Sequence, residues 1–184
     1  MRGRKISCPR GQAVRPSTDR ARQAFFNILT SNFIEEWQGV RAVDLFAGTG
    51  ALGLEAISRG AKACTFVEQD RKVVKVLEKN LLLAQATGSV ASLVRADVYD
   101  FLQQKHIASR VGQVDLVLAD PPYGKGHLIK LLGVLSRSGD FLSSRALMVF
   151  EGEKGIKMPE KYSGFKLLKS RNYGHSSLFF FRKE

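Results

Sequence analysis

Residues 43–56 read VDLFAGTGALGLEA, and the architecture of the whole chain can be built outward from this pattern. A short apolar run ends near Phe46, and Gly48, Gly50 and Gly53 follow as the sequence changes to helix-forming residues. Glycines allow a tight turn and a close approach of helix to strand. The stretch therefore predicts a strand that passes through a glycine turn into a helix, as in cofactor-binding α/β sheets.

The alternation of strand and helix continues toward the C-terminus. Strands are predicted at 41–46, 63–70, 89–97, 114–120 and 146–152, with helices at 51–60, 70–86, 98–104 and 128–135. This order is typical of a doubly wound parallel sheet. Residues 164–174 and 176–184 read as two strands joined by a turn at Gly174. The prediction is an α/β, Rossmann-like sheet that is mostly parallel, with one antiparallel strand from a C-terminal hairpin.

Ahead of the sheet, a basic arm leads into an amphipathic helix. Pro16, Ser17 and Thr18 signal a helix start, and apolar residues recur at helical spacing as far as Phe33. The length suits one core, so we treat 1–184 as a single domain in which 1–36 form the arm and the leading helix.

The net charge of +12 is concentrated in two flanks. Residues 1–22 hold seven Lys or Arg and one acid, residues 154–184 hold eight and two, and the body between them is neutral. Such flanks favour a polyphosphate partner, either nucleic acid or a membrane surface, over a role in solubility alone. No apolar run is long enough to span a membrane and no signal peptide is apparent, so we expect a cytoplasmic protein. Two cysteines fit neither a metal motif nor a disulfide framework.

Acidic residues end the first four predicted strands: Asp44, Glu68, Asp97 and Asp120. In sheets of this type, ligands bind at the carboxyl ends of the strands. The glycines also match the dinucleotide pattern GxGxxG, with Glu68 twenty residues after Gly48. A nicotinamide-dependent oxidoreductase is therefore one alternative, and a purely structural turn is another.

Asp44 favours a different cofactor. A pyrophosphate site uses backbone donors and a helix N-terminus, and an added carboxylate would oppose the phosphates. S-adenosylmethionine (SAM) has no phosphate but carries an ammonium and a sulfonium group, which Asp44 would attract directly or through water. In this interpretation Glu68 accepts from the ribose hydroxyls, Asp97 accepts from the adenine amino group, and Val98 packs on the adenine ring.

The second informative stretch is LVLADPPYGKG at residues 116–126. Asp120 and the Pro121 carbonyl could accept the two hydrogens of a planar amine and so aim its lone pair at a methyl group. Proline rings fix their φ angles, so both acceptors stay in place while positive charge develops on the nitrogen. Tyr123 offers a ring on which an extruded base can stack. This strand end therefore suits methylation of an exocyclic amine.

Several segments, in this order, resemble the class I SAM-dependent methyltransferases: VDLFAGTGALGLEA, FVEQD, RAD and DPPY. RGRKI, RPSTDRARQAFFNIL and NYGHSSLFFF are similar to the bacterial 16S ribosomal RNA guanine-N2 methyltransferase family, over nearly the whole chain. The resemblance implies methyl transfer from SAM to the N2 amine of a guanine in 16S ribosomal RNA, within an assembling small ribosomal subunit. Members usually have more residues before RGRK and a Glu where Gln23 stands, so the leading helix lacks that charge here.

The predicted site has three groups of residues, with no metal and no assembly beyond a monomer. The catalytic residues are Asp120, Pro121, Pro122 and Tyr123. The SAM-binding residues are Asp44, Phe46, Gly48, Thr49, Gly50, Gly53, Glu68, Gln69, Asp97 and Val98. The RNA-binding residues are Arg4, Lys5, Arg15, Arg20 and Lys125. Methylation of adenine N6 is the nearest alternative, and a non-catalytic RNA-binding module is a further one.

Overall fold

The computed structural model describes residues 19–122, 124, 126–174 and 176–184. Their strands form one eight-stranded sheet in the order β3-β2-β1-β4-β5-β8-β7-β6. The strands are β1 Arg41–Leu45, β2 Ala63–Glu68, β3 Ala91–Arg95, β4 Val114–Ala119, β5 Leu142–Glu153, β6 Lys161–Tyr162, β7 Phe165–Tyr173 and β8 Ser176–Lys183. β1 to β5 are parallel, and β8 runs antiparallel between β5 and β7. The predicted fold class, a mostly parallel α/β sheet with a C-terminal hairpin, is confirmed.

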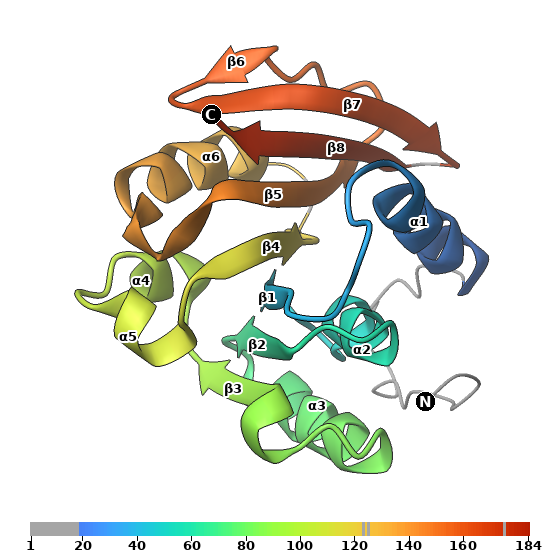
Figure 1. Cartoon of the computed structure of the whole chain (residues 1–184), viewed down its shortest axis with the longest axis vertical. Coiled ribbons are helices and arrows are strands. Elements are labelled where there is room, and N and C mark those ends of the chain that lie inside the picture. Colours follow the sequence, from blue (N-terminus) through green and yellow to red (C-terminus); the bar gives the residue numbers. More distant parts are fainter. Residues whose placement is uncertain (1–18, 123, 125, 175) are drawn as a thin grey trace.

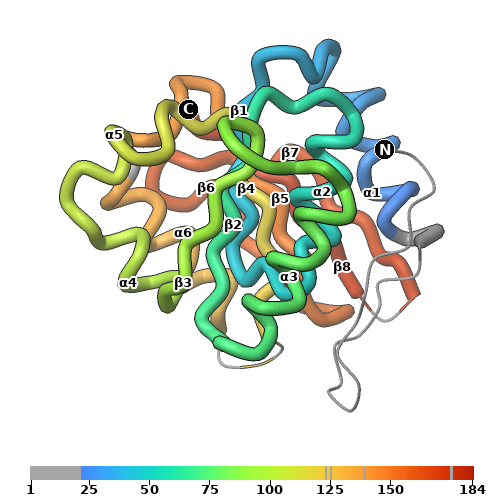
Figure 2. The backbone as a smooth tube through the Cα atoms, turned by 90° about the horizontal axis from the view of Figure 1, so that it is seen from below, coloured from blue at the N-terminus to red at the C-terminus, as the bar shows by residue number. Residues whose placement is uncertain are grey.

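Helices cover both faces of the sheet, as Figures 1 and 2 show from two directions. On one face lie α1 Asp19–Asn32, α2 Ala51–Ser58 and α3 Arg71–Leu83; on the other lie α4 Val98–Leu102, α5 Ile107–Val111 and α6 His127–Arg137. The short turns η1 Gly88–Val90 and η2 Gly139–Phe141 precede β3 and β5. No helix in the described part of the chain has both the length and the apolar character needed to cross a membrane.

Two hydrophobic cores follow from the alternation of side chains along each strand. Ala42 of β1 belongs to the core that also contains Phe26 of α1, whereas Val43 and Leu45 belong to the core that contains Leu131 of α6. Because successive side chains of a strand point to opposite faces, strands buried on both faces read as nearly continuous apolar runs. This explains why the central strands were predictable from composition alone.

The leading helix packs on the C-terminal strand, although the two are far apart in the sequence. The ring of Phe180 in β8 stacks with Phe25 at 6.3 Å and with Phe33 at 5.2 Å between centroids. Arg59, the residue after α2, forms an ion pair with Glu55 of α2 at 2.9 Å and lies over the Phe26 ring of α1. These contacts fix the start of the described chain against the sheet near its antiparallel edge.

The structure differs from the predicted elements in a few places. α5 and β6 were not predicted, because five and two residues are too few to show a period. β5 begins at Leu142 rather than 146; after the buried Leu142 come the polar residues 143–145, two of them exposed, and the pairing with β4 shifts between Val114 and Leu116. α3 begins after Asp70, whose carboxylate caps the helix by accepting from Lys72 N and Val73 N.

Candidate active site

The glycine turn between β1 and α2 uses its three glycines for different reasons. Gly48 and Gly50 have φ angles of 54° and 84°, in the left-handed region that glycine adopts at low cost. Gly53 has an ordinary backbone, but a β-carbon there would lie 2.3 Å from Phe66 Cε1 and 2.7 Å from Cys64 Sγ of β2. Helix α2 can therefore approach the sheet closely only because residue 53 has no side chain.

Two of the predicted SAM-binding carboxylates hold this turn in place. Gly53 N donates to Asp44 Oδ2 at 2.8 Å, and Gly48 N donates to Glu68 Oε2 at 2.9 Å. Asp70 N donates to the other Glu68 oxygen at 2.9 Å. A carboxylate oxygen can accept more than one hydrogen bond, so Glu68 retains acceptor capacity toward a ribose. Its predicted role in cofactor binding stays a prediction.

The turn has a further support that the sequence did not reveal. Asn80 Nδ2 of α3 donates to the Thr49 carbonyl at 2.9 Å, and Asn80 is only 2% exposed. The signal was a single polar residue on the apolar face of a predicted helix, and its partner could not be deduced from spacing. Phe46, at the start of the turn, has a φ of 59°, which is uncommon for a residue with a side chain.

Asp44, Glu68 and Asp120 form what we call the acidic row, on three adjacent strands. Asp44 pairs in register with Phe66 and with Leu118, so these residues share one face of the sheet. Glu68 and Asp120 each lie two residues further on and therefore project to the same face. The row places negative charge along the carboxyl ends of β2, β1 and β4, which suits a cationic ligand and opposes a pyrophosphate.

Burial raises the pKa of Asp44 from its usual value of 3.8 to about 8, because a carboxylate loses its hydration in the core. The hydrogen bond from Gly53 N opposes this effect, and the charges of Asp120 and Glu68 add to it. Asp44 is 1% exposed and supports the turn through its bond with Gly53 N. Near pH 7 its carboxyl group is mostly protonated in the ligand-free protein, and it becomes charged when a nearby positive charge lowers its pKa.

On the other face, Asp97 caps α4 by accepting from Tyr99 N at 2.8 Å and from Asp100 N at 3.2 Å through the same oxygen, Oδ1. Val98 packs in the core and is 3% exposed. Asp97 and Val98 thus have structural roles, and their predicted contacts with adenine stay predictions. Gln69 follows β2 and is exposed.

A cluster of rings, missed by the sequence analysis, lies between α4 and α6. Tyr99 Oη lies 2.7 Å from His127 Nδ1, and the Phe46 ring contacts both rings edge-on at about 6 Å. Lys130 Nζ lies 3.8 Å from the centre of the Tyr99 ring. Burial, and then the charge of Asp97, raise the pKa of the Tyr99 hydroxyl. The cluster joins the glycine turn to the start of α6.

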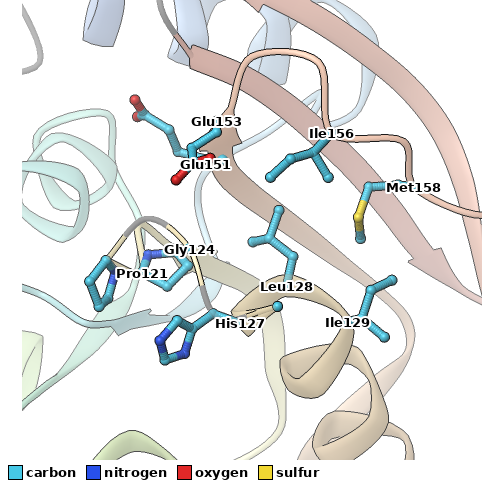
Figure 3. A pocket seen from close by; sticks show the side chains of 12 residues that line it. Pro121, Gly124, His127, Leu128, Ile129, Glu151, Glu153, Ile156 and Met158 are labelled. Carbon is cyan, nitrogen blue, oxygen red and sulfur yellow. The ribbon is translucent and has the colours of Figure 1, made fainter.

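Asp120 follows the last residue of β4 and is exposed, with Pro121 buried beside it and Pro122 exposed. A cavity of about 260 Å³ lies between this loop, the start of α6 and the end of β5 (Figure 3). Tyr123 and Lys125 are outside the described residues, as are Arg4, Lys5 and Arg15. Arg20 lies in α1, and the structure does not describe its side chain. The structure therefore brings Asp120 and Pro121 together with the glycine turn and leaves the RNA-binding predictions as predictions.

Comparison with known proteins places the chain in a family. The family described as "Conserved hypothetical protein 95" matches residues 1–182. The "Ribosomal RNA small subunit methyltransferase D" of Escherichia coli K12 is 33% identical over 183 residues, which cover 100% of this chain and 86% of that protein. This chain belongs to the ribosomal RNA small subunit methyltransferase D family. The family implied by the sequence motifs is thereby confirmed.

Solved structures support the assignment to the methyltransferase D family. The structure of yhhF from Escherichia coli has a TM-score of 0.81 and 34% identity, covering 100% of this chain and 93% of that one. A protein of Thermus thermophilus has a TM-score of 0.78 and 30% identity, covering 97% and 93%. These two proteins therefore share the overall fold of this chain.

Proposed function

We propose that this chain transfers the methyl group of SAM to the exocyclic N2 amine of a guanine in small-subunit ribosomal RNA. Membership in the methyltransferase D family supports the methylation of ribosomal RNA. Guanine N2 is our choice of acceptor. The observation that supports it best is the tip of β4, where surface Asp120 adjoins buried Pro121 on the same edge as the acidic row.

The residues of the chain can hold both reactants. When bound, SAM supplies an electrophilic methyl group on a positively charged sulfur, and the acidic row attracts that charge. Asp120 and the Pro121 carbonyl accept from the two amine hydrogens and so orient the nitrogen lone pair. The carboxylate stabilises the positive charge that develops on the nitrogen, and a proton leaves that nitrogen afterwards. The prolines keep both acceptors fixed, which limits reorganisation during the reaction.

The RNA is proposed to be held by the N-terminal basic flank and by Lys125 in the loop after β4. Arg4, Lys5, Arg15, Arg20 and Lys125 would contact phosphates, which positions the substrate and makes binding salt-dependent. We further propose that the whole chain acts as a single monomeric domain in the cytoplasm, on a small ribosomal subunit during its assembly.

The proposed function is tested by nucleoside analysis of 16S ribosomal RNA from cells with and without this protein. We expect loss of N2-methylguanosine in its absence and restoration by the purified protein with labelled SAM. Label in N6-methyladenosine instead would overturn the choice of guanine. Binding of NADH without binding of SAM, measured by calorimetry, would favour an oxidoreductase.

The raised pKa of Asp44 predicts that the affinity for SAM depends on pH. A cationic ligand lowers the pKa of Asp44 from about 8, so binding near pH 7 should release a proton. The affinity should then rise with pH by up to about tenfold per unit and level off above the pKa. In the Asp44→Asn variant, both this proton release and the rise of SAM affinity with pH that it causes should be absent. Calorimetry in buffers of different ionisation enthalpy measures the number of protons released on binding. Subtracting the value for Asp44→Asn from that for the wild type removes the contribution of protons that titrate on SAM itself.

The Asp44 carboxyl group should also make the folding stability of the ligand-free protein depend on pH. Its folded-state pKa lies above the usual 3.8, so the folded state binds this proton more tightly than the unfolded state. Stability should therefore fall as the pH rises from about 4 to about 8, by at most about 1.4 kcal/mol per unit. Denaturant unfolding of Asp44→Asn should show a weaker fall. An equal pH dependence in both proteins would contradict the assignment.

A further inference from the structure

Glu151 lies directly beside Asp120. Ala119 of β4 pairs in register with Phe150 of β5, so Asp120 and Glu151 are the next residues on two neighbouring parallel strands. The preceding same-face pair, Leu118 and Val149, is also in register. Neighbouring strands are about 4.8 Å apart. Glu151 therefore extends the acidic row by one strand, on the side away from the glycine turn.

Glu151 and Glu153 are unmatched within the described part of the chain. Both side chains are partly buried, and among the described residues neither takes part in a hydrogen bond or an ion pair. Their carboxylate oxygens are not among the buried polar atoms that lack a partner, so they keep contact with solvent. A solvent-accessible carboxylate without a protein partner can accept a donor from a ligand, and Glu151 holds such a position directly beside the proposed catalytic residue.

The cavity at this edge combines these acids with apolar walls. Pro121, Leu128, Ile156 and Met158 supply the apolar lining, and Figure 3 shows both glutamates on the side of Pro121 and the loop at Gly124. Pockets for drug-sized ligands span about 300–1,000 Å³. A cavity of about 260 Å³ is suited to one flat ring system that offers hydrogen-bond donors along an edge.

We propose that Glu151 accepts the N1–H of the target guanine and so selects guanine over other purines. The inference rests on the proposed function, because it assumes that Asp120 holds the N2 amine. N1 is bonded to the carbon that carries this amine, so N1–H falls toward the carboxylate next to Asp120. Adenine has a lone pair at N1, which would face the Glu151 carboxylate without a shared proton. Glu151 is thus a specificity residue, adjacent to the group that holds the reacting nitrogen.

The experiment uses small ribosomal subunits in which the methylated guanine has been mapped and then replaced by 2-aminopurine. This base keeps the 2-amine but has no hydrogen on N1. We expect the wild-type protein to methylate guanine about 100-fold or more faster than 2-aminopurine, because the Glu151 carboxylate, covered by the bound base, loses its donor. Glu151→Gln should narrow this preference to within about tenfold, since a glutamine amide can donate to N1 as well as accept from it.

Asp140→Asn is the control, because it removes a carboxylate charge from an exposed position in η2, before β5 and outside the cavity. It should keep the wild-type preference. Any effect of 2-aminopurine on the particle itself applies equally to the wild type and the two variants. It therefore cancels when their ratios of methylation rate, guanine over 2-aminopurine, are compared. Thermal unfolding of the variants verifies that each is folded.

The outcomes separate this inference from the proposed function. If the wild type forms no N2-methylguanosine on the guanine particle, the proposed function fails. If it methylates guanine but accepts 2-aminopurine equally well, the role of Glu151 is wrong, and this result needs no variant. An unchanged preference in folded Glu151→Gln would also overturn it.

Discussion

Asp120→Ala is expected to slow methyl transfer to the RNA by about 10²–10³-fold in kcat, with the Kd for SAM nearly unchanged. The side chain leaves β4 at the surface and would contact the amine, whereas the turn that holds the cofactor is fixed by other groups, Asp44 and Glu68. Single-turnover methylation and calorimetric SAM binding measure the two effects separately.

Two further variants sharpen this test. Asp120→Asn keeps an acceptor oxygen but loses the charge, so its loss should be intermediate if the carboxylate both orients the amine and stabilises the developing charge. Asp140→Asn removes an exposed acid in η2, before the start of β5, and should have wild-type activity. Full methylation activity of Asp120→Ala would reject the catalytic role of Asp120.

Gly53→Ala is expected to destabilise the fold and to weaken SAM binding together. Its new methyl group would lie 2.3 Å from the Phe66 ring, and this ring is fully buried and cannot move aside freely. Overpacking of this kind costs about 1–3 kcal/mol, which corresponds to a fall in Tm of about 5 °C for a domain of this size. Displacement of α2 would also lengthen the bond from Gly53 N to Asp44, so the affinity for SAM should fall about tenfold or more.

Gly133→Ala provides the comparison, since Gly133 is also a helical glycine. A β-carbon at Gly133 in α6 would lie 3.3 Å from the Tyr162 hydroxyl, with Arg137 Nη1 and Tyr162 Cε1 at 3.7 and 3.8 Å. Alanine is favoured over glycine within helices by about 1 kcal/mol. We expect nearly unchanged stability and SAM binding. Equal thermal unfolding of Gly53→Ala and Gly133→Ala would contradict the claim that residue 53 must lack a side chain.

The sequence predicted the central strands and their flanking helices well, because local periodicity reflects burial. The continuous apolar run of β4 and the helical spacing of α1 both follow from the faces that they bury. The same reasoning missed α5 and β6, which are too short to show a period. It also placed the start of β5 too late, since the polar residues 143–145 separate the buried Leu142 from the apolar run that begins at Ala146.

The candidate site was predictable only in part. The acids at the strand ends could be identified because parallel strands place their carboxyl ends at one edge of the sheet. The contacts of Asn80 with Thr49 and of Tyr99 with His127 could not, since each joins residues that are distant in the sequence. The burial of Asp44, and hence its raised pKa, depends on helices packed over the strand rather than on its neighbours in the chain.

By itself, then, the sequence determined the fold class, the glycine turn and the acid that ends each strand, because these depend on local backbone geometry and on side-chain periodicity. Only the tertiary structure decided which acids are neighbours. Strand order is set by packing between distant segments, and this packing places β4 between β1 and β5. For that reason Asp120 lies between Asp44 on one side and Glu151 on the other, an arrangement that no spacing along the chain could reveal.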